Sequence, residues 1–102
     1  SFPTRRSSDL GVYATRVFFE NGDSRPAVTN VGVRPTVDDG GRVNVEGFIL
    51  DFSGDLYGQT IRMEFYKRLR GERKFPNLEA LRSEVMRNAE QTRAYFKRTE
   101  ER

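Results

Sequence analysis

The 102-residue sequence predicts a mainly β fold, an antiparallel sandwich or barrel followed by one C-terminal α-helix. Two observations indicate this class. Several short segments rich in β-branched and aromatic residues are separated by turns containing Gly and Asp. In the last third, the apolar residues recur at the helical period instead of the strand period. The length fits one small domain.

The first two strands are expected at residues 12–19 and 27–33. Residues 12–19 (VYATRVFF) combine β-branched and aromatic side chains, and the turn-forming segment Asn-Gly-Asp follows at 21–23. The second strand is expected to end at Pro35, because proline cannot donate a hydrogen bond to a neighbouring strand.

Two further strands are expected at residues 43–52 and 61–66. They follow turns at residues 38–41 (DDGG) and 53–55 (SGD). Apolar side chains fall on both faces of residues 43–52, which indicates a strand buried on both sides for part of its length. This pattern favours a small barrel.

The helix is expected to begin after Pro76, with Asn77 as its N-cap. Glu84 with Arg87, and Glu90 with Arg93, have the i,i+3 spacing of helical ion pairs. We expect the helix to close one side of the barrel. Its apolar face is predicted to comprise Leu78, Leu81, Val85, Ala89, Thr92 and Phe96.

The composition excludes several kinds of site. Without Cys or His, the chain has no disulfide, thiolate metal site, Ser-His triad or His-ligated zinc. No apolar run is long enough to span a membrane, and no signal peptide is recognisable, so we expect a cytoplasmic protein. Chemistry must therefore depend on carboxylates, hydroxyls, Lys, Arg and backbone groups.

The net charge of +3 is unevenly distributed. Residues 1–60 carry 6 basic and 8 acidic side chains, whereas residues 61–102 carry 12 and 7. The basic C-terminal part indicates an anionic partner, either nucleic acid or a phosphorylated small molecule. A solvated helix face of mixed charge explains the same excess equally well.

The first ten residues (SFPTRRSSDL) differ from the rest of the chain. They show no periodicity, directly precede a well-defined strand and resemble a translated sequencing-library adapter. We therefore expect residues 1–10 to be foreign, residues 11–98 to form the domain, and residues 99–102 to be a tail.

Ordered motifs connect the central part of the chain to a known family. They are GVYA at 11–14, VTNVGVRPT at 28–36, VEGFILDFSGDLYG at 45–58, RLRGERKF at 68–75 and LEAL at 78–81. Together they resemble the riboflavin kinase family, in particular the C-terminal domain of the bacterial bifunctional riboflavin kinase/FAD synthetase. The resemblance covers roughly residues 11–98.

The resemblance implies a six-stranded antiparallel Greek-key β-barrel with a C-terminal helix. It implies transfer of the γ-phosphoryl group of ATP to the 5′-hydroxyl of riboflavin, giving FMN, with Mg²⁺ as the cofactor. Glu46 lies where the family has its catalytic glutamate. A carboxylate suits this role, because an attacking sugar hydroxyl needs a positioned proton acceptor. The alternative is that Glu46 is an ordinary solvent-facing strand residue.

The same resemblance implies that Arg70 and Phe75 contact the flavin. An arginine can donate to flavin or phosphate oxygens, and an aromatic ring can pack beside the isoalloxazine. The alternative for both is packing and surface charge at the start of the helix. Asp55 to Gly58 are expected to form a tight turn, with Gly58 at positive φ. Asn30, Gly32, Pro35 and Thr36 are expected only to shape the nucleotide side of the barrel.

The sequence departs from the family pattern in two ways. Phe48 replaces the histidine that usually follows the catalytic glutamate by two positions. The family's N-terminal strands, with a Gly-rich loop and a Pro-Thr-Ala-Asn motif, are not recognisable; Phe2-Pro3-Thr4 imitates that motif, but Arg5 and Arg6 follow. We therefore interpret the chain as an N-terminally truncated kinase fragment and expect the 102-residue chain itself to be inactive.

Two other functions remain open at this stage. One is a non-catalytic flavin-binding barrel, which would not depend on Glu46 as a base. The other is a small basic barrel that binds nucleic acid, in the manner of OB-folds. The strands carry the acidic part of the chain, which disfavours nucleic acid. The expected partners are riboflavin, FMN, ATP and ADP, with neither nucleic acid nor membrane.

Overall fold

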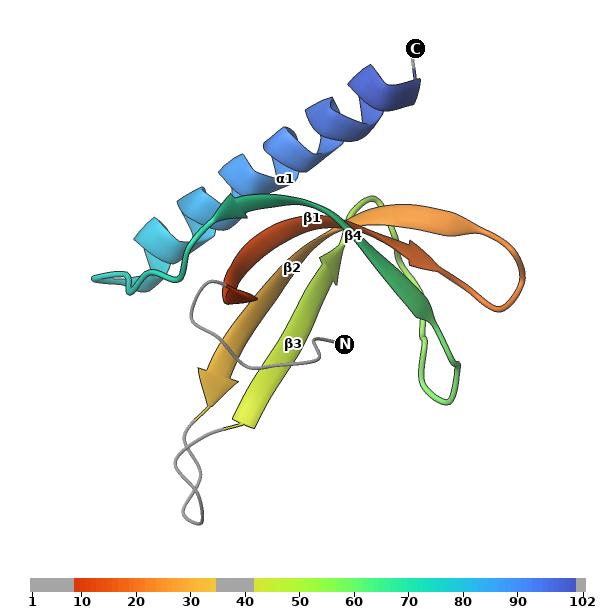
Figure 1. Cartoon of the computed structure of the whole chain (residues 1–102), viewed down its shortest axis with the longest axis horizontal. Coiled ribbons are helices and arrows are strands. Elements are labelled where there is room, and N and C mark those ends of the chain that lie inside the picture. Colours follow the sequence, from red (N-terminus) through yellow and green to blue (C-terminus); the bar gives the residue numbers. More distant parts are fainter. Residues whose placement is uncertain (1–8, 35–41, 101–102) are drawn as a thin grey trace.

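The computed structural model of the chain describes residues 9–34 and 42–100. Four strands and one helix follow one another along the sequence (Figure 1). The elements are β1 (Gly11–Phe18), β2 (Ser24–Arg34), β3 (Arg42–Ile49), β4 (Arg62–Arg70) and α1 (Leu78–Glu100). The predicted turn at 38–41 and residues 1–8 lie outside the described residues.

The four strands form one antiparallel sheet in the order β3-β2-β1-β4. Strands β1, β2 and β3 follow each other as neighbours, and β4 returns to pair with the free side of β1. This is the Greek-key arrangement, so the predicted topology is confirmed. Among the described residues the sheet has four strands and does not close into a complete barrel.

The sheet curls, so that side chains from its two outer strands approach each other on the inner face. A Cβ added to Gly47 on β3 would lie 3.2 Å from the Met63 side chain on β4. Between them, the hydroxyls of Thr15 and Thr29 are buried and share a hydrogen bond of 2.7 Å. The sheet is therefore barrel-like although its edges are not joined.

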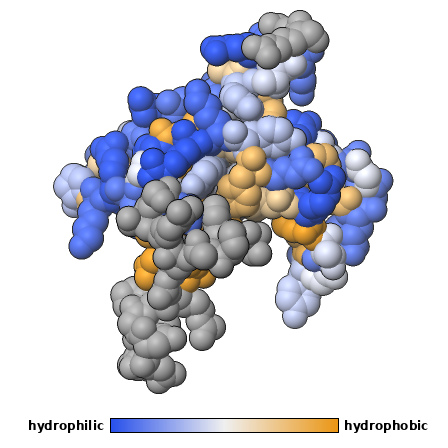
Figure 2. All heavy atoms as spheres, in the orientation of Figure 1, coloured by the Kyte–Doolittle hydropathy of each residue, from blue (hydrophilic) through white to orange (hydrophobic). Residues whose placement is uncertain are grey.

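The helix α1 lies along the outer face of the sheet and packs mainly against β2 and β1 (Figure 1). Val12, Val28 and Leu50 from the sheet side meet Ala89 of the helix in the main apolar cluster. Burying a side chain of this kind stabilises the fold by about 1.5–3 kcal/mol. On the face of the molecule in Figure 2, apolar residues are visible between the hydrophilic surfaces of the helix and the strands.

The four strands expected from the residue pattern are present in the expected order in the described part of the chain, but their boundaries differ. Strand β2 begins at Ser24, because the turn at Gly22 (φ 96°) lets Ser24 pair directly with Phe18. Pro26 is accommodated within the strand, where its carbonyl accepts a hydrogen bond from the Leu50 amide. Strand β4 extends to Arg70, four residues beyond the predicted end.

The prediction for residues 43–52 was wrong in two respects. Strand β3 ends at Ile49, and the chain turns at Asp51, whose φ is 54°. The strand is not buried on both faces, since Val45 and Phe48 are 46% and 51% exposed. The reason is that α1 packs mainly against β2 and β1 and leaves much of β3 uncovered.

The helix prediction was correct in its start and only partly correct in its buried face. Asn77 caps the helix, because its Oδ1 accepts a 2.8 Å hydrogen bond from the Ala80 amide. Leu78 and Leu81 are 67% and 39% exposed, whereas the polar residues Glu84 and Asn88 are buried. The first turns of α1 thus border a groove instead of packing on the sheet. Both predicted ion pairs, Glu84 with Arg87 and Glu90 with Arg93, are present.

Candidate functional site

The residues of the candidate site form one row of cross-strand pairs that runs across the sheet. Glu46 on β3 pairs with Asn30 on β2, Asn30 pairs with Val12 on β1, and Val12 pairs with Arg70 on β4. Residues directly opposite each other in antiparallel strands project to the same face. The register therefore places Glu46 and Arg70 on one face, about 14 Å apart if the sheet were flat.

A cavity of about 280 Å³ lies over this row, between the sheet and the helix. We call it the polar cavity. All four residues of the row line it, and Phe48 and Asn88 also contribute to its wall. Glu46 is exposed to solvent. The structure thus brings the predicted base, Glu46, and the predicted flavin contact, Arg70, to the same cavity.

Arg70 is held by contacts to the helix. Its Nε donates to Asn88 Oδ1 at 3.1 Å and lies 3.1 Å from Glu84 Oε2, while Nη1 donates to the Gly71 carbonyl. Its side chain is only 16% exposed. Burial lowers the pKa of Arg70 from its ordinary value, and the Glu84 carboxylate acts in the opposite direction. Among the described contacts Nη2 has no hydrogen-bond partner, so its two protons can serve a ligand.

Strand β1 approaches the backbone of Arg70 closely. Gly11 has a φ of 143°, and a Cβ there would lie 2.4 Å from the Arg70 carbonyl oxygen. Only glycine fits this position without displacing the end of β4. The first residue of the GVYA motif therefore has a structural role beside the site.

Phe75 lies beside a second cavity of about 290 Å³, which Arg70, Glu72 and Arg73 also line. Two guanidinium groups lie over the Phe75 ring. The distance from Cζ to the ring centroid is 5.5 Å for Arg70 and 4.9 Å for Arg73. Both distances are in the range of cation–π contacts. Asn30 and Arg70 line this cavity and the polar cavity alike, so the two adjoin.

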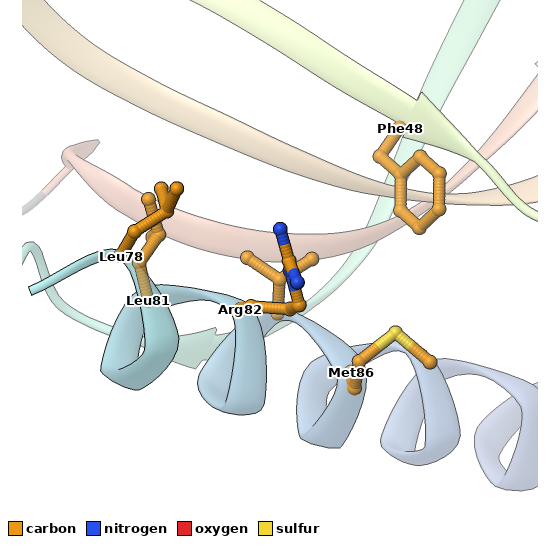
Figure 3. A pocket seen from close by; sticks show the side chains of 6 residues that line it. Phe48, Leu78, Leu81, Arg82 and Met86 are labelled. Atoms are coloured by element: carbon orange, nitrogen blue, oxygen red, sulfur yellow. The ribbon is translucent and has the colours of Figure 1, made fainter.

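An apolar groove of about 410 Å³ continues the site along the start of α1. Phe48 on β3 lies across it from Leu81 and Met86 on the helix (Figure 3), and Val85 also lines it. Phe48 borders both this groove and the polar cavity. The residue that replaces the family's histidine thus joins an apolar surface to the polar row.

Sequence reasoning missed Glu84 and Asn88, which surround the Arg70 guanidinium. Two polar residues at i and i+4, adjacent to the apolar face of an amphipathic helix, are the signal that could have found them. Their burial depends on Arg70 lying next to the helix, and the sequence of the helix does not indicate where Arg70 lies.

Of the residues expected to shape the nucleotide side, Asn30 lines both the polar cavity and the second cavity beside Phe75. Gly32 lies against the loop after β4, since an added Cβ would be 2.6 Å from Glu72 Oε2. Pro35 and Thr36 lie outside the described residues. The turn before β4 is as predicted: Asp55 Oδ1 accepts from the Tyr57 amide, and Gly58 has a φ of 82°.

Within residues 9–34 and 42–100, no three Asp or Glu side chains lie close enough to hold a metal ion. No helix in that part of the chain is long and apolar enough to cross a membrane.

Comparison with known proteins gives consistent matches. The model of the riboflavin kinase family, Flavokinase, matches residues 2–96. The chain is 41% identical over 90 residues to the bifunctional riboflavin kinase/FMN adenylyltransferase of Pseudomonas fluorescens and covers 29% of that protein. It is 38% identical over 96 residues to the protein of the same name from Escherichia coli K12 and covers 30% of it. The chain thus spans less than a third of the length of these relatives.

A solved structure shares the fold. A crystal structure described as a macrolide-efflux protein from Streptococcus pneumoniae superposes with a TM-score of 0.75 and 31% identity, over 82% of this chain and 27% of that one. The superposition supports the barrel-like sheet and helix, while the match of the family model over most of the sequence identifies the family. The chain belongs to the riboflavin kinase family.

Proposed function

We propose that the chain is a fragment of the kinase domain of a bifunctional riboflavin kinase/FMN adenylyltransferase and that this domain, when intact, phosphorylates riboflavin. The γ-phosphoryl group of ATP would pass to the ribityl 5′-hydroxyl, giving FMN and ADP. Family membership supports the reaction, and the observation that carries the assignment of residues is the shared cavity of Glu46 and Arg70. We propose the cytoplasm as the site of the reaction, because ATP is available there.

Glu46 is the proposed general base. Its carboxylate accepts the proton of the 5′-hydroxyl while that oxygen forms a bond to the γ-phosphorus, and the bond from this phosphorus to the β,γ-bridging oxygen breaks to release ADP. A carboxylate that is exposed at the mouth of a cavity can receive a hydroxyl group directly. Base catalysis of this kind contributes about 10²–10⁴-fold to the rate.

Arg70 and Phe75 are the proposed flavin contacts. The Nη2 group of Arg70 can donate to a ring or phosphate oxygen, and Phe75 offers an aromatic surface beside it. The polar cavity measures about 280 Å³, and the adjoining cavity beside Phe75 measures about 290 Å³. Together they fall within the roughly 300–1,000 Å³ that small-molecule sites occupy.

The family implies a divalent ion, Mg²⁺ in our proposal, bound together with ATP. Mg²⁺ commonly uses only one or two protein carboxylates besides phosphate oxygens. The described residues form no cluster that fits a metal site built by the protein alone. We therefore assign no metal ligand in this part of the chain and derive no step through the ion.

Two measurements test this function. Riboflavin is titrated into the 102-residue chain while flavin fluorescence is recorded; we expect saturable quenching. FMN formation is then measured in a chimera in which residues 11–98 replace the corresponding C-terminal part of the Pseudomonas fluorescens protein. Binding without FMN formation would support a non-catalytic flavin barrel, and absence of binding would contradict the flavin site altogether.

A further inference from the structure

Glu84 lies at the centre of three arginines. It is 9% exposed, and its Oε2 lies 3.1 Å from Arg70 Nε and 3.1 Å from Arg87 Nη1. Its Oε1 lies 3.5 Å from Arg73 Nη1. Asn88 adds a longer hydrogen bond of 3.4 Å from Nδ2 to Oε2. One buried carboxylate is therefore shared by three guanidinium groups.

Without this carboxylate the arginines would repel one another. Arg70 is mostly buried, so solvent screens its charge poorly, whereas Arg73 and Arg87 are 55% and 63% exposed and can turn outward. Removing one partner of a buried ion pair leaves a charge uncompensated. Glu84 thus fixes the place of two guanidinium groups, those of Arg70 and Arg73, that lie over the Phe75 ring.

Glu84 itself lines none of the three cavities of the site. Any effect on a ligand must therefore pass through the groups that Glu84 contacts, which are the arginines and Asn88. We propose that Glu84 is a positioning residue that orients Arg70 and Arg73 for flavin binding. This inference rests on the flavin site proposed above.

The test uses the 102-residue chain with riboflavin as the probe. Glu84→Gln keeps the shape of the side chain and removes its charge. We expect the Kd for riboflavin to rise about 3- to 10-fold, since one charge-assisted contact of Arg70 is weakened. Glu90→Gln is the matched control, because Glu90 also pairs with an arginine at i+3 but is 72% exposed and lines none of the three cavities; its Kd should not change.

Two further variants separate positioning from general stability. Asn88 Oδ1 already lies 3.1 Å from Arg70 Nε, so Asn88→Asp places a new carboxylate on that guanidinium. The double variant Glu84→Gln/Asn88→Asp should regain riboflavin affinity. In an Arg70→Ala background, Glu84→Gln should raise the Kd much less than it does in the native chain. Thermal unfolding of each variant checks the fold, and Glu84→Asp replaces Glu84→Gln if the latter unfolds at the assay temperature.

The outcomes distinguish this inference from the function on which it rests. A native chain that binds riboflavin, with Glu84→Gln binding equally well, overturns only the positioning role. The positioning role is also overturned if the effects of Glu84→Gln and Arg70→Ala on the Kd for riboflavin are fully additive. The same holds if Asn88→Asp fails to restore the affinity that Glu84→Gln lowers. If the native chain does not bind riboflavin, the proposed function fails. The positioning of Arg70 is then tested without a ligand, through the NMR signal of its Nε–Hε group. A signal that does not shift in Glu84→Gln overturns the positioning role.

Discussion

Glu46 and Arg70 experience different environments although they line the same cavity. Arg70 is mostly buried and is held by the helix through Glu84 and Asn88. Glu46 is exposed on an outer strand, where a substrate hydroxyl can approach it. A binding residue benefits from a fixed orientation, whereas a base needs access to the proton that it removes. The two proposed roles therefore match the two environments, and each gives a prediction.

Glu46→Gln should abolish the base and preserve binding. In the chimera described above we expect the rate of FMN formation to fall about 10²–10⁴-fold, because the amide cannot accept the proton. The Kd for riboflavin should stay within about twofold, since the side chain keeps its shape. Glu20→Gln is the control, as Glu20 lies in the β1–β2 turn, away from the described cavities. Near-normal turnover in Glu46→Gln would exclude Glu46 as the base.

Arg70→Ala should weaken riboflavin binding by about 1–3 kcal/mol, because a charge-assisted contact is lost. Arg70→Lys should recover only part of this, since an ammonium group cannot reproduce the planar guanidinium. Fluorescence titration measures both. Arg62→Ala is the matched control on the same strand: Arg62 contacts Glu64 and Phe18 at the other end of β4. Equal quenching curves for the native chain and Arg70→Ala would reject the flavin contact.

Among the elements, α1 connects the core to the site. Its later residues Ala89, Thr92 and Phe96 are buried, while its first turns carry Glu84 and border the apolar groove. The start of the helix must therefore be fixed locally, because little of the sheet covers it. Asn77 provides this through its cap on the Ala80 amide.

Asn77→Ala should lower the free energy of unfolding by about 1 kcal/mol, since a backbone amide loses its partner. Urea unfolding should show a lower midpoint with an unchanged slope. Ser83→Ala is an exposed substitution within the same helix and should change stability by less than about 0.5 kcal/mol. An Asn77→Ala midpoint equal to that of the native chain would show that the cap contributes nothing measurable.

For the whole molecule, one ion pair ties the turn after β3 to α1. Both oxygens of Asp51 accept hydrogen bonds from Arg93, at 3.3 and 3.1 Å. The hydrogen bonds from Arg93 lower the pKa of Asp51 below its ordinary value of 3.8. Asp51 also has a φ of 54°, a conformation that Asp and Asn adopt more readily than most residues. Asp51→Asn therefore removes the charge without straining the turn.

The stabilisation from this pair should depend on pH. Because the folded-state pKa of Asp51 lies below the unfolded value, the stabilisation is complete above the unfolded pKa and is lost as the pH falls through the folded pKa. We expect the native chain to melt at a higher temperature than Asp51→Asn at pH 7, and the difference to vanish near pH 2, below the ordinary value of 3.8. Asp23→Asn, in the exposed β1–β2 turn, is the control for the chemical change from Asp to Asn. A difference that persists unchanged at low pH would rule out the ion pair as its cause.

The sequence by itself determined the local features of this protein. Residue type and period predicted four strands and a helix in the correct order, the Asn77 cap and the positive φ of Gly58. Ordered motifs also indicated the family that the comparison then identified. The strands, the helix, the cap and the turn depend on neighbouring residues, so a single chain segment contains the information for each, whereas the family signal came from the order of several motifs.

The tertiary structure alone decided how these parts meet. Strand pairing placed Glu46, Asn30, Val12 and Arg70 in one row, left β3 at the edge with Phe48 exposed, and buried Glu84 and Asn88 beneath Arg70. No period in the sequence specifies which strand lies beside which, because pairing depends on contacts between distant segments. The burial of a helix face likewise depends on what the sheet provides opposite it. The candidate site is therefore a product of register and docking, and its separate residues acquire a shared cavity only when the sheet has formed.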